Sequence, residues 1–178
     1  KTKILDREYS FYTDNGVFSK NKLDFGTRTL IESINLDELH GKVLDVGCGY
    51  GVIDIVLSKI TDAFFEGIDV NLRALHLAKM NAKLNNTDNV KFYESNVYEN
   101  VNSKYNFIIT NPPIRAGKKI VYDIVMNARF HLEENGILYI VIRKEQGAKS
   151  MVRDLSKYYK TEVIAKNKGF FVIKCNLH

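Results

Sequence analysis

Residues 43–51, VLDVGCGYG, place three alternating glycines directly after a short apolar run. A run of this length with β-branched residues is typical of a buried strand. Glycines at its end permit a tight turn and let the backbone come close to a ligand. Val52 stands where the dinucleotide fingerprint G-x-G-x-x-G would have its third glycine, which disfavours a nicotinamide cofactor. On its own, the loop leaves two interpretations open: a ligand-binding loop and a purely structural connection.

Short apolar runs recur on both sides of this stretch, and segments with helical periodicity separate most of them. Strands are expected at residues 43–46, 63–68, 90–93, 105–109, 137–142, 161–166 and 170–175. Helices are expected at 26–35, at 71–86 with Asn71 as N-cap, and at 118–132 with Asn135-Gly136 closing it. The turn at 167–169 joins the last two strands into an antiparallel hairpin. This alternation predicts an α/β protein with a Rossmann-like, doubly wound sheet of seven strands, mostly parallel with one antiparallel strand near the C-terminal edge.

The size and composition of the chain fit one soluble domain. Its 178 residues are 45% apolar, so we expect a single domain over 1–178. No apolar run approaches the roughly 18 residues that a membrane span needs, and the N-terminus lacks the apolar segment of a secretory signal. Cys48 and Cys175 alone cannot hold a metal cluster, and no metal is expected. A reducing cytoplasm fits these features, and the net charge of +5 permits a polyanionic partner without demanding one.

Two polar residues stand at the ends of expected strands, where ligands bind in sheets of this kind. Asp69 ends the strand after the glycine loop, and its carboxylate can accept hydrogen bonds from both hydroxyls of a ribose. Asn96 follows the next strand, and its amide oxygen can accept from the exocyclic amine of an adenine. An ordinary turn asparagine is nearly as good an interpretation of Asn96.

The only two prolines of the chain, Pro112 and Pro113, follow Asn111 directly after another apolar run. Proline fixes its own φ, has no N–H and restrains the residue before it to extended geometry, so this exit from the strand is stiff. The side-chain oxygen of Asn111 and the carbonyl of Pro112 can then converge on one –NH2 group, whose lone pair they orient towards an electrophile. The alternative is a double-proline strand terminator with no chemical role.

These stretches together resemble a known family. Asp45–Gly51, Asp69 and Asn111–Ile114, in this order, resemble the class I S-adenosylmethionine-dependent methyltransferases that methylate amino groups. Tyr12–Ser19, Leu23–Thr27 and the extended motif Asn111–Lys118 further resemble the small-domain (MTS) methyltransferases, in particular the RsmC-like branch that acts on guanine N2 of ribosomal RNA.

The resemblance implies S-adenosyl-L-methionine as cofactor and a role for each matching residue. Gly47, Gly49 and Gly51 would line the methionine part of the cofactor, with Asp45 supporting their loop. Asp69 would hold the ribose, and Asn96 and Val97 would meet the adenine. Within the N-terminal segment, residues 1–40, Gly26 and Thr27 would close over the methionine end.

The resemblance also implies the substrate side of the site. Asn111 and Pro112 would receive the target amine, and Pro113 and Ile114 would contact the base. Arg115, Lys118 and Lys119 would bind flanking phosphates, because three cations at a helix start are unfavourable without an external anion. The implied partner is ribosomal RNA or the small ribosomal subunit, and the implied enzyme is a cytoplasmic monomer.

Two departures from the family pattern keep alternatives open. Family members commonly carry Asp where Asn96 stands, and many amino methyltransferases have an aromatic residue where Ile114 stands. Adenine-N6 methylation of RNA or DNA is therefore an alternative. Protein glutamine-N5 methylation is another, although such enzymes usually end the motif in Tyr and carry a further helical domain. An inactive cofactor-binding or RNA-binding module is the alternative outside catalysis.

Overall fold

The computed structural model describes residues 2–5, 7–13 and 24–178. The strands of its main sheet are β3 (Lys42–Val46), β4 (Phe64–Asp69), β5 (Val90–Glu94), β6 (Tyr105–Thr110), β7 (Leu132–Arg143), β8 (Tyr159–Asn167) and β9 (Phe170–Leu177). The helices are α1 (Phe25–Ser33), α2 (Val52–Ile60), α3 (Leu72–Leu84), α4 (Lys118–Asn127) and α5 (Ala148–Leu155). A separate small hairpin joins β1 (Thr2–Ile4) and β2 (Arg7–Tyr9) near the N-terminus.

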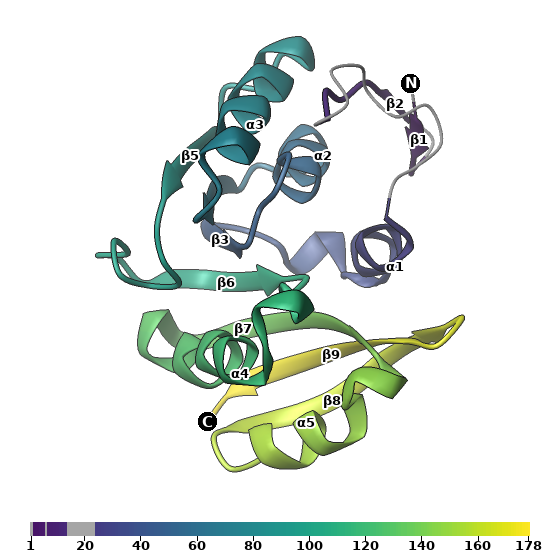
Figure 1. Ribbon diagram of the computed structural model, residues 1–178, viewed down its shortest axis with the longest axis vertical. Helices are drawn as coiled ribbons and strands as arrows, with labels where there is room; N and C mark the ends of the chain where they lie inside the picture. The colour runs from purple at the N-terminus through teal and green to yellow at the C-terminus, as the bar shows by residue number, and fades with distance from the viewer. Residues whose placement is uncertain (1, 6, 14–23) are drawn as a thin grey trace.

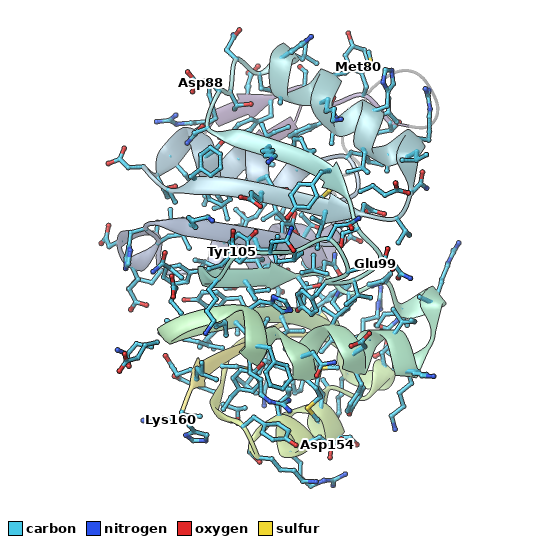
Figure 2. All side chains as sticks on the ribbon, turned by 90° about the vertical axis from the view of Figure 1, so that its left-hand side faces the viewer. Met80, Asp88, Glu99, Tyr105, Asp154 and Lys160 are labelled. Atoms are coloured by element: carbon cyan, nitrogen blue, oxygen red, sulfur yellow. The ribbon has the colours of Figure 1, made fainter. Side chains whose placement is uncertain are left out.

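The main sheet has seven strands in the order β5-β4-β3-β6-β7-β9-β8 (Figure 1). Strands β3 to β7 run parallel, while β9 runs antiparallel to both β7 and β8. Figure 2 shows that the strands follow one another along the long axis, with Met80 and Asp88 at one end, Tyr105 between, and Asp154 and Lys160 at the other. The predicted fold class is confirmed, including the single antiparallel strand next to the edge.

Helices cover both faces of the sheet. Because successive strand residues face opposite sides, Val43 and Leu44 of β3 enter two different cores. The first core contains the buried faces of α1, α2 and α3, and the second contains those of α4 and α5. The chain order reverses between β3 and β6, which makes the C-terminal ends of these neighbouring strands the expected ligand crevice.

Local sequence explains several element ends. The side chain of Asn71 accepts a hydrogen bond from the Ala74 N–H at 3.1 Å and caps α3, as predicted. Lys168 and Gly169, with φ 48° and 85°, form a two-residue turn with two positive φ angles between β8 and β9. Turns of this kind match the twist of antiparallel strands, so the predicted hairpin is confirmed.

The predicted helix end near Leu132 was wrong. Helix α4 ends at Asn127, a 3-10 turn covers Ala128–His131, and Leu132 already begins β7 opposite Tyr105. Ala128 and Leu132 are buried and fit the helical spacing of α4, although they lie in the turn and in the new strand. Both of these elements also place apolar residues in the core, so the spacing did not reveal the end of the helix. Asn135-Gly136 is no helix cap but an irregular stretch of β7. A Cβ at Gly136 would lie 2.8 Å from the Glu133 carbonyl oxygen, so the chain needs glycine there.

Two asparagines, Asn81 in α3 and Asn85 at its C-cap, attach the N-terminal segment to the domain. Asn81 is fully buried; its amide donates to the carbonyl oxygens of Tyr12 and Tyr50 and accepts from the Tyr12 N–H. One turn later, Asn85 donates to the Ser10 carbonyl oxygen at 2.8 Å and accepts from its N–H at 3.3 Å. Each asparagine thus pairs with the backbone as a neighbouring strand would. Of the motif Tyr12–Ser19, residues 14–19 lie outside the described residues.

Candidate active site

The C-terminal ends of β3, β4, β5 and β6 enclose a cavity of about 240 Å³. Its lining includes five residues predicted for the site: Gly47, Asp69, Asn96, Val97 and Pro113. The other lining residues are Val46, Ile68, Val70, Ser95, Ala116, Ile120 and Ile124. The cavity therefore brings the glycine loop and the proline motif together: a Cβ at Gly47 would lie 3.8 Å from Pro113 Cδ.

The glycine loop is held by backbone hydrogen bonds to the end of β4. The N–H groups of Gly47 and Cys48 both donate to the Ile68 carbonyl oxygen at 2.9 Å. Gly49 has φ 54°, and a Cβ on it would meet nothing within 4 Å, so its surroundings are open. Gly51 needs glycine for another reason, since with φ 87° its Cβ would press on the Phe92 ring at 2.8 Å. Neither Gly49 nor Gly51 is among the residues that line the cavity.

Asp69 ties the glycine loop to the start of the next helix. Its Oδ2 accepts from the Gly49 N–H and its Oδ1 from the Asn71 N–H, both at 2.9 Å. Each carboxylate oxygen can accept a second hydrogen bond. The fixed carboxylate at the cavity wall can therefore still accept from two vicinal hydroxyls.

Val97 has an unusual backbone at the cavity wall. Its φ is 53°, a genuine outlier for a β-branched residue, and such a conformation costs energy and persists only where neighbouring contacts hold it. The Ser95 hydroxyl does so, because it donates to the Val97 carbonyl oxygen at 2.7 Å and accepts from the Asn100 N–H at 3.0 Å. Ser95 was missed from the sequence, although serine after a strand is a frequent turn former. Ile120 and Ile124 of α4 were also missed as lining residues.

Asn111 is held by two residues that come much earlier in the chain. Its Nδ2 donates to Asp24 Oδ2 at 2.9 Å and to Thr27 Oγ1 at 3.0 Å. Asp24 Oδ2 also accepts from the Thr27 N–H at 3.0 Å and so caps α1. The amide nitrogen of Asn111 is thereby engaged, and its Oδ1 points away from this pair. Asp24 was not among the predicted site residues; its N-cap position before the expected helix was the available signal.

The other predicted N-terminal residues lie close by. Thr27 meets Asn111 directly, as described above. Gly26 packs against a neighbouring ring, since a Cβ on it would lie 2.8 Å from Phe170. Their predicted closure over the methionine end of the cofactor stays a prediction.

Beneath the glycine loop lie two buried carboxyl groups, Asp45 and Asp54, which are 1% and 0% exposed. The two carboxyl groups interact with each other and with the backbone at Asp54, so one of them keeps its proton and donates to the other. Burial raises the pKa of Asp45 to about 6, against the opposing effect of its hydrogen bond with Asp54. Burial and the charge of Asp45 raise the pKa of Asp54 as well. Asp54 was not anticipated from the sequence.

This acid pair predicts a pH-dependent stability. A carboxyl group with a raised pKa in the folded state stabilises the fold fully below its unfolded pKa of about 4, and that contribution is lost as the pH rises through the folded pKa. The free energy of unfolding is therefore expected to fall by about 1–3 kcal/mol between pH 4 and pH 8. Asp54→Asn should flatten this slope, because an amide donates to Asp45 without a titrating proton. Urea unfolding across this range, with the exposed Asp62→Asn as control, measures it; equal slopes in all three proteins would contradict the account.

The residues after the prolines form a short turn and the start of α4. Ile114–Ala116 is a 3-10 turn, and Gly117, with φ 99°, precedes α4 without a side-chain cap or an acidic residue in the first turn. Arg115, Lys118 and Lys119 are exposed. Ile114 is half-buried and lines a second cavity of about 240 Å³ between α4 and α5. The three cations thus surround an uncapped helix N-terminus, as the sequence predicted.

A family model described as "Methyltransferase small domain" matches residues 8–174. The chain belongs to the methyltransferase small-domain family. It is therefore an S-adenosylmethionine-dependent methyltransferase, and the predicted family and cofactor are confirmed. The cavity suits this cofactor, since Gly47 of the glycine loop, the fixed Asp69 carboxylate and an apolar wall meet within it.

The sequence of this methyltransferase is similar to those of two relatives. "Uncharacterized protein YbxB" of Bacillus subtilis is 45% identical over 176 residues, which cover 97% of this chain and 88% of that protein. "Ribosomal RNA small subunit methyltransferase C" of Haemophilus influenzae is 35% identical over 140 residues, which cover 76% of this chain and 42% of that protein. The chain thus spans less than half the length of this second relative.

Solved structures show the same fold. The T. thermophilus 16S rRNA N2 G1207 methyltransferase (RsmC), in complex with AdoMet and guanosine, aligns with a TM-score of 0.86 at 23% identity, over 99% of this chain and 49% of that one. A ribosomal protein L11 methylase from Lactobacillus delbrueckii aligns with a TM-score of 0.73 at 19% identity, over 86% of this chain and 78% of that one. In the described part of this methyltransferase, no helix is long and apolar enough to span a membrane.

Proposed function

We propose that this methyltransferase transfers a methyl group to the exocyclic N2 amine of a guanine in small-subunit ribosomal RNA. The observation that carries the proposal is the orientation of Asn111. This residue does not line the cavity, but its backbone oxygen would lie 4.0 Å from a Cβ on the cavity residue Gly47. Its amide nitrogen is engaged by Asp24 and Thr27, and its side-chain oxygen is available for an –NH2 group. The relatives named ribosomal RNA small subunit methyltransferase C support RNA as the substrate class. Guanine N2 is supported by the structural relative from T. thermophilus, a 16S rRNA N2 G1207 methyltransferase, and by the motif after Asn111.

The cofactor half of the site follows from the residues around the cavity. We assign Gly47, Gly49 and Gly51 to the methionine part of the cofactor, with Asp45 supporting their loop. Asp69 would accept from the ribose hydroxyls with its remaining lone pairs, and Asn96 with Val97 would meet the adenine. Gly26 and Thr27 would close over the methionine end as part of an N-terminal segment, 1–40, of a single domain spanning 1–178.

The transfer itself requires positioning more than acid or base catalysis. Bound S-adenosylmethionine supplies a methyl group that its sulfonium already activates. Asn111 Oδ1 and the Pro112 carbonyl accept the two amine hydrogens, so the nitrogen lone pair turns towards the methyl group. Pro113 has no N–H that could compete for these acceptors. The amine loses its extra proton to water after the transfer.

The substrate half lies around the start of α4. Pro113 and Ile114 would contact the target base, while Arg115, Lys118 and Lys119 would bind phosphates at the uncapped helix N-terminus. On the other side of Asn111, Arg143 ends β7, and the Lys144 N–H donates to the Gly169 carbonyl oxygen in the hairpin turn. Lys168 of that turn lies over the Phe25 ring beside Asp24. Cations on both sides of Asn111 support a polyanionic substrate, which we expect a cytoplasmic monomer to bind.

Replacing Arg115, Lys118 and Lys119 together by alanine should raise the apparent KM for RNA several-fold and flatten its dependence on salt. The affinity for S-adenosylmethionine should stay nearly unchanged, because these side chains do not line its cavity. Titrations at several salt concentrations measure the slope. The matched control is Lys79, Lys83 and Lys91 replaced by alanine, which removes the same charge from exposed positions on α3 and on the edge strand β5. An unaltered slope in the first variant would move the RNA surface, for example to the hairpin turn at Lys166–Lys168.

A labelled-cofactor experiment tests the proposed function against its alternatives. The purified protein is incubated with labelled S-adenosylmethionine and, separately, naked ribosomal RNA, isolated small subunits and a release factor, and the products are digested to nucleosides. We expect N2-methylguanosine from the RNA or the subunits. Label in N6-methyladenosine or in the release factor would replace the proposal by the corresponding alternative. Cofactor binding without transfer to any substrate would favour a binding module.

A further inference from the structure

We infer that Asp24 is a positioning residue for methyl transfer: its carboxylate fixes the amide of Asn111 so that Oδ1, and not the amide nitrogen, faces the incoming amine. The inference rests on the proposed function for its catalytic consequence. Its structural part concerns residues of this chain alone. Nothing in the family resemblance of the sequence assigned a role to Asp24.

The hydrogen bonds allow only one orientation of the Asn111 amide. The Asp24 carboxylate can only accept, and it takes one hydrogen of the amide at 2.9 Å. The Thr27 hydroxyl donates its single hydrogen to Asp24 Oδ2 at 3.2 Å, so towards Asn111 it can only accept, at 3.0 Å. Both neighbours of this end of the amide are therefore acceptors. A flipped amide would place Oδ1 against a carboxylate and a hydroxyl oxygen, with no donor between them.

The prolines cannot set this orientation. Pro112 restrains the backbone of Asn111, but the terminal torsion of an asparagine side chain is broad and roughly two-fold. Without a partner, the amide would also populate the flipped state, in which its N–H donors face the N–H donors of the target amine. The stiff backbone thus fixes where the amide lies, and Asp24 fixes which of its two ends faces the substrate.

Asp24 also has a structural role at the start of α1, and a test must separate that role from its contact with Asn111. It caps α1 through its hydrogen bond from the Thr27 N–H. Serine caps a helix about as well as aspartate but is too short to reach Asn111 as well. Asparagine caps equally well, and its side-chain oxygen still reaches Asn111. Asp24→Ser therefore removes only the contact with Asn111, and Asp24→Asn keeps both contacts.

We expect Asp24→Ser to lower kcat about 10-fold, with KM for RNA, cofactor affinity and Tm close to those of the wild type. Asp24→Asn should keep most of the wild-type kcat. In an Asn111→Ala background, Asp24→Ser should lower kcat no further, because the two side chains act as one unit. A loss that multiplies with that of Asn111→Ala would overturn the inference, and so would wild-type kcat in Asp24→Ser.

The contact itself is measured without turnover. In ¹H–¹⁵N spectra, the side-chain NH2 resonances of Asn111 are identified by their loss in Asn111→Ala. Bonding to a carboxylate should slow their exchange with water; this protection should disappear in Asp24→Ser and persist in Asp24→Asn. Unchanged exchange in Asp24→Ser would overturn the inference. If the wild type methylates no RNA while the resonances behave as expected, the proposed function fails and the orientation of the amide stands.

Discussion

Asn111→Ala is expected to lower kcat for methyl transfer by about 100-fold or more, with the fold intact and S-adenosylmethionine affinity within a few-fold of the wild type. The reason is that the alanine removes the acceptor that orients the target amine, while the Pro112 carbonyl and the bound cofactor stay in place. Single-turnover methylation measured with saturating RNA and cofactor gives the rate, and calorimetry gives the cofactor affinity.

Asn176→Ala in β9 is the matched control, because it removes the same side chain opposite Ile137 of β7, away from the C-terminal end of β6 where the proline motif lies. This variant should keep the wild-type rate. An Asn111→Ala protein that retains most of its turnover would show that the two prolines only terminate β6. The amide would then have no part in the chemistry.

Asp69→Ala should weaken S-adenosylmethionine binding by about 1.5 to 3 kcal/mol, the scale of hydrogen bonds to a charged group. Two effects combine in this loss. The ribose loses its acceptor, and the N–H groups of Gly49 and Asn71 lose the carboxylate that holds the glycine loop to β4. Calorimetric titration with S-adenosylmethionine measures the change, and a parallel titration with NAD should give no appreciable binding in either protein.

The neighbouring strand provides the control for Asp69. Glu94 pairs with Asp69 in the register of β4 and β5, is exposed, and does not line the cavity. Glu94→Ala removes the same charge one strand away and should leave the affinity unchanged. Equal affinities in Asp69→Ala and the wild type would remove Asp69 from the cofactor site.

Most strands of the sheet could be predicted because an apolar run is followed by glycine or turn residues, whereas β7 begins at Leu132, five residues before the predicted start at residue 137. The run before Gly47 is apolar and ends in glycine, and Lys168-Gly169 is a turn sequence that accepts positive φ. The end of α4 could not be predicted, because Leu132 suits a helix face and a buried strand equally well. Periodicity indicates which residues face the core, but it does not show whether a helix or a strand carries them.

For the candidate site, the residues at strand ends could be predicted from the sequence, and the contacts between distant elements could not. Asp69 and Pro113 stand at strand ends, and the fold alone brings such ends to one edge. The contact between Asn111 and Asp24 joins a position just after β6 with one just before α1, and only the packing of α1 against the sheet brings them together. Asp54 was missed for a related reason, since a charged residue on a helix is expected at the surface. Its partner Asp45 comes from a different element.

Asn81 and Asn85 attach the N-terminal segment through its backbone. The segment should therefore tolerate substitution at the attached positions better than the two asparagines do. In the N-terminal segment, the two asparagines bond to backbone atoms of Ser10 and Tyr12, so these hydrogen bonds do not depend on which side chains those two positions carry. The hydrogen bonds do depend on the side chains at positions 81 and 85, because only a side-chain amide offers a donor and an acceptor in the spacing of a peptide group. Sequence variation across homologues should therefore be broad at position 10 and narrow at positions 81 and 85.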